Sequence, residues 1–436
     1  MNKQSTALLE KIESKTAVIG IIGLGYVGLP LGIEFVNGGF PVIGFDLDEK
    51  KTDAINAGTS YIKHIPDENV AVFTQHVNCL ATTDFSRLKD ADCIIICVPT
   101  PLTKHREPDM SYIRSTAQTI KEHLREGQLV TLESTTYPGT TREVLQPILE
   151  ETGLKASTDF FLAYSPERED PGNKNFGTRK IPKVVGGLGE DALKLATTMY
   201  DAVVVSTVPV SSPDAAEATK LLENIFRSVN IALVNELKVV FDKMDIDIWE
   251  VIEAAKTKPF GYMPFYPGPG LGGHCIPIDP FYLTWKAREF EESTRFIELA
   301  GEINTSMPDY VVSKVFESLN SGGKSISGSR ILILGLAYKP NIDDDRESPS
   351  YVLIKKLRKL GADVSFNDPF VPEIRKTREH GDLAGMKSVE IDSSFDLLLL
   401  LTDHDEYKSF DFTSIDVPLV DTRNCVNAVP ANYLKA

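Results

Sequence analysis

Apolar residues form short continuous runs in the first half of the chain, and polar stretches separate these runs. The run at 17–23 ends in glycine, which is typical of a buried parallel strand. Further strands are expected at 41–46, 93–98, 129–132 and 160–164. Because intervening segments such as 111–124 have helical character, the alternation predicts a doubly wound parallel α/β sheet.

One long helix is expected from about Asp214 to Asp242. Apolar residues keep i+3/i+4 spacing along it, at Leu222, Ile225, Val229, Leu233, Leu237 and Val240. A separate polar stripe with the same spacing carries Glu217, Lys220, Asn224 and Arg227. Such a helix is expected to bridge two domains.

The strand-and-helix pattern resumes after the glycine pair at 322–323. Strands are expected at 330–335, 362–368 and 395–401. The first turn of this part lacks a full glycine triplet, so it need not bind a dinucleotide. The predicted fold is therefore two Rossmann-like doubly wound domains, at 1–210 and 306–436, joined by a central helical region at 211–305.

The composition is that of an ordinary soluble globular protein. Its 436 residues, 42% hydrophobic and 25% charged, favour two or three domains. No apolar run approaches the roughly 18–20 residues of a membrane span, and the first fifteen residues contain no signal-peptide stretch. Five scattered cysteines indicate reduced thiols and a cytoplasmic location. Cys93 and Cys97 are expected to be buried thiols and not a metal pair.

The net charge of −16 argues against nucleic acid as a partner, because polyanion binding requires a basic surface. The same charge should repel an anionic small ligand. Such a ligand must then be held by a few local cations in a site that excludes water. Lys339, Arg346 and Arg423, in the C-terminal loops, are the candidates.

Gly23, Gly25 and Gly28 lie between the first strand and a helix, in a dinucleotide-binding pattern. Gly23 permits the tight turn, Gly25 lets the pyrophosphate approach the backbone, and Gly28 lets helix and strand pack closely. Asp46 follows the second strand and suits a ribose diol, which favours NAD over NADP. The alternative is a tight turn without a cofactor.

Cys275 ends a glycine-crowded segment, 267–275, and precedes Asp279 by four residues. The glycines indicate backbone built for close approach to a ligand, and the prolines that follow indicate a turn into a helix. A helix N-terminus would lower the pKa of the thiol and favour a nucleophilic thiolate. The alternative is a small packed residue. His274 is equally a candidate base or a structural neighbour.

Other candidate groups lie on the long helix and after the strands of the first domain. Lys220 and Asn224 are one helical turn apart and could donate to the same oxygen, although a solvated helix face is the simpler interpretation. Glu167 follows a strand, a usual location for chemistry in α/β folds, but a surface carboxylate is the alternative. The hydroxyl-rich segment 133–141 suits ligand contacts or helix capping.

Together these motifs resemble the UDP-glucose/GDP-mannose dehydrogenase family of nucleotide-sugar 6-dehydrogenases. The matching segments, in chain order, are 23–28, 133–141, 165–168, 217–224, 268–280 and 335–350. Within the family the chain is most similar to bacterial UDP-N-acetyl-D-glucosamine 6-dehydrogenases. The segments that indicate this branch are 165–172, 255–261 and 272–280.

The resemblance implies a four-electron oxidation of a sugar C6 alcohol by two NAD⁺ in succession. Cys275 would be the nucleophile, first in a thiohemiacetal and then in a thioester. Lys220 and Asn224 would stabilise negative charge on the C6 oxygen. Asp279 would position water and transfer protons, with assistance from Thr135.

The resemblance also implies binding contacts and an assembly. Glu167 would serve in thioester hydrolysis. NAD would contact Gly23, Gly25, Tyr26, Val27, Gly28, Asp46, Thr100, Thr135 and Arg346. The UDP-sugar would contact Glu167, Arg168, Lys220, Asn224, Gly272, Gly273, Tyr338, Lys339 and Arg423. The region 211–305 would form a homodimer or a higher homo-oligomer, and 306–436 would bind the UDP-sugar.

Three positions depart from the glucose-specific members of the family. Ile278 stands where those members usually carry a lysine, and Pro171 replaces their second carboxylate. The arginine that they show near Pro259 and Phe260 is absent from this chain. These differences favour an N-acetylhexosamine over glucose.

The sequence therefore predicts oxidation of UDP-N-acetyl-D-glucosamine to UDP-N-acetyl-D-glucosaminuronate, for O-antigen lipopolysaccharide or capsular polysaccharide synthesis. UDP-N-acetylmannosamine, UDP-N-acetylgalactosamine and UDP-glucose are alternative substrates. A non-enzyme alternative is an inactive nucleotide-sugar-binding regulator, which the intact set of candidate groups disfavours. No arrangement of His and Cys indicates a metal, and neither nucleic acid nor a membrane is an expected partner.

Overall fold

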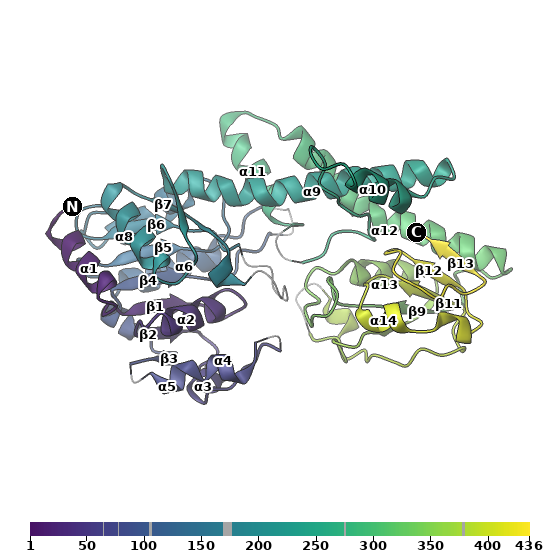
Figure 1. The fold of residues 1–436 in the computed structure, drawn as a ribbon, viewed down its shortest axis with the longest axis horizontal. Helices are drawn as coiled ribbons and strands as arrows, with labels where there is room; N and C mark the ends of the chain where they lie inside the picture. Colours follow the sequence, from purple (N-terminus) through teal and green to yellow (C-terminus); the bar gives the residue numbers. More distant parts are fainter. Residues whose placement is uncertain (64, 77, 104–106, 169–176, 274–275, 377–379) are drawn as a thin grey trace. The chain divides into compact units, whose positions relative to one another are not determined.

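The chain divides into two units, each built on one β-sheet, in a computed structural model (Figure 1). The structure describes residues 1–436 except 64, 77, 104–106, 169–176, 274–275 and 377–379. The first unit comprises residues 1–223 and 281–292, and the second comprises residues 224–280 and 293–436.

An eight-stranded sheet forms the centre of the first unit, in the order β3-β2-β1-β4-β5-β6-β7-β8. Its strands are β1 (Ile19–Ile22), β2 (Val42–Phe45), β3 (Leu80–Thr82), β4 (Cys93–Ile96), β5 (Leu129–Leu132), β6 (Phe161–Tyr164), β7 (Lys183–Gly187) and β8 (Thr207–Val210). Neighbours from β3 to β6 are parallel, which confirms the fold class predicted from the apolar runs. In contrast, β7 is antiparallel to β6.

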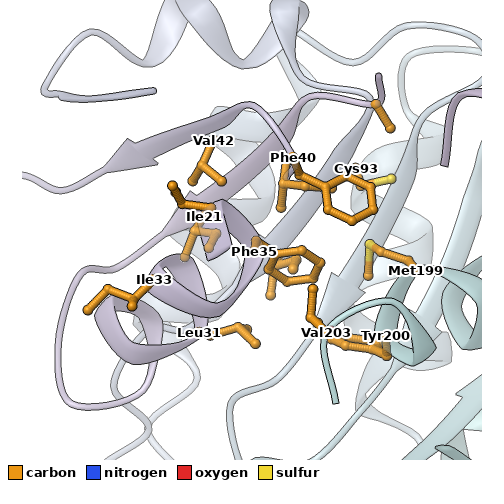
Figure 2. Packing of buried hydrophobic residues seen from close by; sticks show 14 of the residues in the cluster. Ile21, Leu31, Ile33, Phe35, Phe40, Val42, Cys93, Met199, Tyr200 and Val203 are labelled. Carbon is orange, nitrogen blue, oxygen red and sulfur yellow. The ribbon is translucent and has the colours of Figure 1, made fainter. Parts of the chain in front are cut away.

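Every residue of β1, β2, β4, β5 and β6 is buried, as expected for strands covered on both faces. The helices of this unit are α1 (Lys3–Glu13), α2 (Gly28–Asn37), α3 (Glu49–Asn56), α4 (Asp67–Val70), α5 (Val72–Gln75), α6 (Ser111–Lys121), α7 (Gln146–Glu150), α8 (Glu190–Asp201) and most of α11 (Asp279–Ala287). Phe35 on α2 and Tyr200 on α8 meet in the core, with ring centroids 6.2 Å apart (Figure 2). The buried Cys93 lies in the same cluster.

Helix α9 (Pro213–Lys243) is the long helix predicted from the sequence, and it begins with proline at a favourable first position. Most of its polar stripe is buried, with Glu217 and Asn224 fully covered and Lys220 7% exposed, whereas Arg227 is exposed. In its apolar stripe, Leu233 remains 54% and Val240 44% exposed. The helix therefore buries several polar side chains and leaves part of its apolar stripe exposed, unlike an ordinary amphipathic helix.

The second unit contains a five-stranded parallel sheet in the order β10-β9-β11-β12-β13. Its strands are β9 (Arg330–Leu334), β10 (Asp363–Asn367), β11 (Leu397–Leu400), β12 (Leu419–Asp421) and β13 (Tyr433–Lys435). Its helices beyond α9 are α10 (Ile248–Lys256), α12 (Arg295–Ser321), α13 (Pro349–Lys359) and α14 (Asp405–Ser409). The three strands predicted at 330–335, 362–368 and 395–401 are confirmed as β9, β10 and β11.

Among the described residues, no helix combines the length and the apolar character that crossing a bilayer requires.

Candidate active site

The turn between β1 and α2 has the geometry of a dinucleotide cradle. Gly23 has φ +93°, and a Cβ there would lie 2.4 Å from the carbonyl oxygen of Cys97. A Cβ on Gly28 would lie 1.9 Å from the carbonyl oxygen of Gly23. Only glycine fits these two positions, and α2 begins at Gly28, so its first amide groups face this turn.

Gly25 provides an independent test of whether a dinucleotide fits this turn. Within the described part of the chain, no neighbouring atom lies within 4 Å of a Cβ placed on Gly25. Internal packing therefore does not require glycine here, whereas close approach of a pyrophosphate does. Asp46 lies at the same turn, because its Oδ2 accepts from the Leu24 N–H at 2.9 Å. The residues fit a dinucleotide.

Asp46 and Asp368 occupy equivalent positions after the second strand of each sheet pattern, but their contacts differ. Asp368 is buried, and its Oδ2 accepts from the backbone N–H groups of Leu336 and Ala337 at 2.6 and 2.9 Å. His404 lies 3.2 Å from the same oxygen. Although burial opposes it, hydrogen bonding to His404 and the backbone lowers the pKa of Asp368. Asp46, by comparison, accepts from the Leu24 N–H and pairs with Lys51 Nζ at 3.0 Å.

Glu167 lies where the sequence predicted chemistry, just after β6 in the first unit. Its Oε1 accepts from the Arg168 N–H at 2.7 Å, and its Oε2 lies 3.5 Å from Lys183 Nζ. Its backbone carbonyl accepts a hydrogen bond from Lys220 Nζ. Main chain and carboxylate are therefore both oriented by neighbours, which makes the alternative of a solvated surface carboxylate wrong.

Lys220 is a buried ammonium group, so the solvated-face interpretation of this position is wrong. Its partner is the carbonyl oxygen of Glu167. Among the described residues, no carboxylate forms an ion pair with Lys220. A buried cation without a counter-charge is costly, and it is suited to stabilise negative charge on a ligand.

Glu217 ties the hydroxyl-rich segment 133–141 to α9. Its carboxylate accepts from the N–H groups of Gly139 and Thr141 at 2.6 and 2.9 Å and from the Thr141 hydroxyl at 2.7 Å. Burial raises the pKa of Glu217 to about 7, although these three donors act in the opposite direction. Thr135, on the same segment, remains half-buried.

In the second unit, Asn224 and Asp279 are in contact. The Asn224 amide donates to Asp279 Oδ2 and accepts from Arg227 Nη2. Asp279 is buried and begins α11, which confirms the turn-into-helix interpretation of the prolines around it. The contact fixes the Asn224 amide with its nitrogen toward Asp279.

The glycines before Cys275 pack closely against Tyr338. A Cβ on Gly272 would lie 2.5 Å from Tyr338 Cβ, and one on Gly273 would lie 2.7 Å from Tyr338 Cε2. The Gly273 N–H donates to the Arg346 carbonyl oxygen at 3.1 Å. Close approach by Tyr338 thus explains these two glycines. His274 and Cys275 themselves lie outside the described residues.

The loop after β9 carries the predicted cations Lys339 and Arg346. Its backbone is anchored by His404, whose Nδ1 accepts from the Asn341 N–H at 2.9 Å. Arg346 Nη2 lies 2.6 Å from Asp344 Oδ2. Lys339 is half-buried on this anchored loop, where a ligand anion would find a fixed positive charge.

The remaining predicted residues fall into separate places within their units. Arg423 is half-buried and donates from Nε to the Leu401 carbonyl oxygen at 2.8 Å. Arg168 pairs with Glu223 in the first unit. Thr100 is buried, and its carbonyl oxygen accepts from the Tyr282 hydroxyl at 2.9 Å. Tyr26 and Val27 lie at the cradle before α2. These contacts leave the ligand roles as predictions.

The described residues contain no group of three or more His, Cys, Asp or Glu side chains that could hold a metal ion.

Sequence reasoning missed Lys183, Glu133 and Tyr200, which form a buried network beside Glu167. A lysine at the start of a short strand carries no distinct signal, because most lysines are solvated. Glu133, directly after the buried strand β5, was the available signal.

Comparisons with known proteins agree along the whole chain. Models of the UDP-glucose/GDP-mannose dehydrogenase family match the NAD-binding domain at 17–204, the central domain at 214–306 and the UDP-binding domain at 332–428. The chain is 37% identical over 392 residues to protein CapL of Staphylococcus aureus, covering 89% of this chain and 90% of CapL.

Two further similar proteins carry more specific names. A UDP-N-acetyl-D-glucosamine 6-dehydrogenase of Pseudomonas aeruginosa is 34% identical over 398 residues, covering 91% of this chain and 92% of that protein. The solved structure of a UDP-D-ManNAc dehydrogenase from Pyrococcus horikoshii superimposes with a TM-score of 0.86 at 33% identity, covering 95% of this chain and 97% of that one.

Proposed function

The chain belongs to the UDP-glucose/GDP-mannose dehydrogenase family, and from this premise we propose that it oxidises UDP-N-acetyl-D-glucosamine at C6 to the carboxylate. Its NAD-binding and UDP-binding domains make it an NAD-dependent UDP-sugar dehydrogenase. The product would feed O-antigen or capsular polysaccharide synthesis. The similarity over about nine-tenths of the chain to UDP-N-acetyl-D-glucosamine 6-dehydrogenases supports this sugar.

UDP-N-acetyl-D-mannosamine is the second candidate substrate. Similar proteins named for that sugar reach the same identity, 34% over 422 residues, and the Pyrococcus structure supports this sugar equally. The two sugars differ only in configuration at C2, so the reaction at C6 is common to both.

The cradle at Gly23, Gly25 and Gly28, with Asp46, would hold NAD. When bound, NAD supplies the hydride acceptor, once for the alcohol and once for the Cys275 adduct. The balanced reaction converts one C6 alcohol, two NAD⁺ and one water into one carboxylate, two NADH and three protons. A single NAD is insufficient because oxidation of an alcohol to an acid removes four electrons.

The proposed role of each side chain follows from where negative charge develops and where protons move during the reaction. Cys275 adds to the aldehyde carbon, and its sulfur leaves again when water hydrolyses the thioester. Lys220 and Asn224 donate to the C6 oxygen while it carries negative charge. Asp279, already bonded to Asn224, moves protons, and Glu167 activates the water.

The choice of sugar predicts a rank order of substrates. We expect the highest kcat/KM with UDP-N-acetyl-D-glucosamine and a value roughly 10- to 100-fold lower with UDP-glucose, which cannot fill an N-acetyl pocket. Initial rates of NADH formation with the four candidate sugars measure this directly. A higher kcat/KM with UDP-N-acetyl-D-mannosamine would transfer the proposal to that sugar. No NADH from any sugar would favour an inactive binding protein.

The exposed apolar face of α9 supports the proposed homodimer. Phe226, Leu233 and Val240 follow one another at intervals of seven residues, and each is at least 44% exposed. Residues at this spacing share one face of a helix, which suits packing against a second copy. Burying this face would remove apolar surface from water.

A charge placed on that face should dissociate the dimer. We expect Leu233→Glu to give monomers at micromolar concentration in sedimentation velocity, where the wild type sediments as a dimer. Val352→Glu is the matched control, because Val352 is 41% exposed on α13 of the second unit. A monomeric wild type, or a dimer that survives Leu233→Glu unchanged, would contradict the proposal.

A further inference from the structure

The antiparallel pairing of β7 with β6 places Lys183 at the edge of the first sheet where Glu167 lies. β7 runs against β6, with Ala163 opposite Gly187 and Tyr164 opposite Gly186. Continuing this register by three residues places Glu167 opposite Lys183. The first residue of β7 therefore lies at the edge where β5 and β6 end, which is the edge that carries functional groups in α/β sheets.

The ammonium group of Lys183 lies between two carboxylates. Its Nζ is 2.8 Å from Glu133 Oε2 and 3.5 Å from Glu167 Oε2, and the Pro166 carbonyl oxygen is 3.4 Å away. Lys183 is only 3% exposed and Glu133 1%. Burial alone would lower the pKa of Lys183, but the two carboxylates raise it above its ordinary value. The lysine is therefore a charged group inside the fold.

Glu133 is fixed by the core and not only by Lys183. Its Oε1 accepts from the hydroxyl group of Tyr200, and the ring of Tyr200 packs in the hydrophobic core beside Phe35 (Figure 2). Both Glu133 oxygens are therefore engaged. This arrangement ties Lys183 to the rigid centre of the unit, as a positioning group requires.

The two carboxylates are held unequally, and the difference has chemical consequences. The 2.8 Å ion pair with Lys183 compensates the charge of Glu133, which also accepts a hydrogen bond from the Tyr200 hydroxyl group. The 3.5 Å contact places the Lys183 charge beside Glu167 and favours its ionised form, and an ionised carboxylate can accept a proton. Its other oxygen is oriented by the Arg168 N–H.

We propose that Lys183 is a positioning residue that holds the Glu167 carboxylate in place and ionised for hydrolysis of the Cys275 thioester. This inference rests on the proposed function. In the hydrolytic step Glu167 takes a proton from water, the water oxygen bonds to the thioester carbon, the carbon–sulfur bond breaks, and the thiolate leaves. Lys183 forms no bond in this step.

Several titratable groups, Lys183 among them, act on Glu167. Electrostatic interactions link it with Cys97 after β4, Glu133 after β5, Lys183 on β7 and Tyr200 on α8. Burial raises the pKa values of the Cys97 thiol and the Tyr200 hydroxyl far above neutrality, so neither changes charge near pH 7. The charges of Glu133 and Lys183 are then the ones whose removal should change the protonation of Glu167.

The first test is Lys183→Met, followed by rapid mixing. We expect the steady-state kcat to fall roughly 10- to 100-fold, with the KM for the UDP-sugar unchanged within about twofold. The first turnover should still release two NADH per site, and intact-mass spectrometry should detect the sugar acyl group on Cys275. Hydroxylamine, which attacks thioesters without a general base, should release this adduct as the hydroxamate and restore turnover.

Substitutions with opposite electrostatic effects separate positioning from a merely structural role. Removing the cation with Lys183→Met should move the acidic limb of the kcat–pH profile to higher pH. Glu133→Gln leaves Lys183 to pair with Glu167 alone, so the same limb should move to lower pH. Lys183→Arg should recover part of the activity. Shifts of both variants in one direction would overturn the inference.

Lys314→Met is the matched control. Lys314 is also buried between two carboxylates, at 2.7 Å from Asp242 and 2.8 Å from Glu317, in the other unit. We expect no adduct and no change in the pH profile for this variant. If wild type fails to give two NADH, the proposed function is wrong. If wild type succeeds and Lys183→Met loses the first turnover without an adduct, only the inference about Lys183 is wrong.

Discussion

Cys275→Ser should lose acid formation by roughly 10³-fold or more, because a serine hydroxyl is a far weaker nucleophile than a thiolate at neutral pH. Binding of NAD and UDP-sugar should persist, since Gly23, Asp46 and the C-terminal cations remain. Intact-mass spectrometry after one turnover should show either no sugar adduct or a persistent ester on the variant.

The reaction stoichiometry provides the accompanying measurement. Wild-type enzyme should form two NADH per UDP-sugar consumed and release no free aldehyde, because the thioester step retains the half-oxidised sugar. Cys79→Ser is the control, since Cys79 is a half-buried thiol that accepts from the Val42 N–H and has no proposed role. Unchanged acid formation by Cys275→Ser would remove Cys275 from the mechanism. A yield of one NADH with released aldehyde would remove the thioester.

Where apolar runs were long, the sequence predicted the fold well. The strands at 93–98 and 129–132 appear as β4 and β5, because fully buried parallel strands require continuous apolar residues. β7 and β8 were not predicted. β7 begins with a lysine and ends in two glycines, and β8 contains Pro209, which is tolerated because β8 is an edge strand.

Local spacing indicated candidate residues but did not determine their surroundings. A solvated face was the simpler interpretation of the i+4 pair Lys220 and Asn224, and their burial and their contacts with Glu167 and Asp279 exclude it. The long-range contact of Lys183 with Glu133 joins residues fifty positions apart. No local periodicity encodes such a contact, because it depends on β7 running antiparallel to β6.

The glycines near Cys275 show a different reason for incomplete prediction. A glycine cluster signals close approach, but the sequence does not identify the approaching group. At Gly272 and Gly273 that group is Tyr338, more than sixty residues later in the chain. At Gly25 no described protein atom lies within 4 Å of a Cβ placed on this residue, and there we expect glycine to allow close approach of the pyrophosphate.

Lys220→Met should lower kcat/KM by roughly 10²–10³-fold, the usual cost of removing one preorganised donor to a developing oxyanion. Most of this loss should appear in kcat, since the charge on the C6 oxygen develops during reaction and not on binding. Lys220 is 7% exposed and bonded to the Glu167 carbonyl oxygen, so its ammonium group is oriented before a ligand arrives.

Two comparisons make the Lys220 prediction specific. Lys220→Arg keeps the charge but changes its geometry, and it should recover only part of the lost kcat. Lys286→Met removes another buried lysine of the first unit, one that already pairs with Glu143 at 2.6 Å and Glu289 at 2.7 Å. Because those carboxylates neutralise Lys286, its loss should reduce thermal stability and leave kcat within about twofold of wild type. Equal effects of Lys220→Met and Lys286→Met on kcat would show that Lys220 acts through the fold and not on the reacting oxygen.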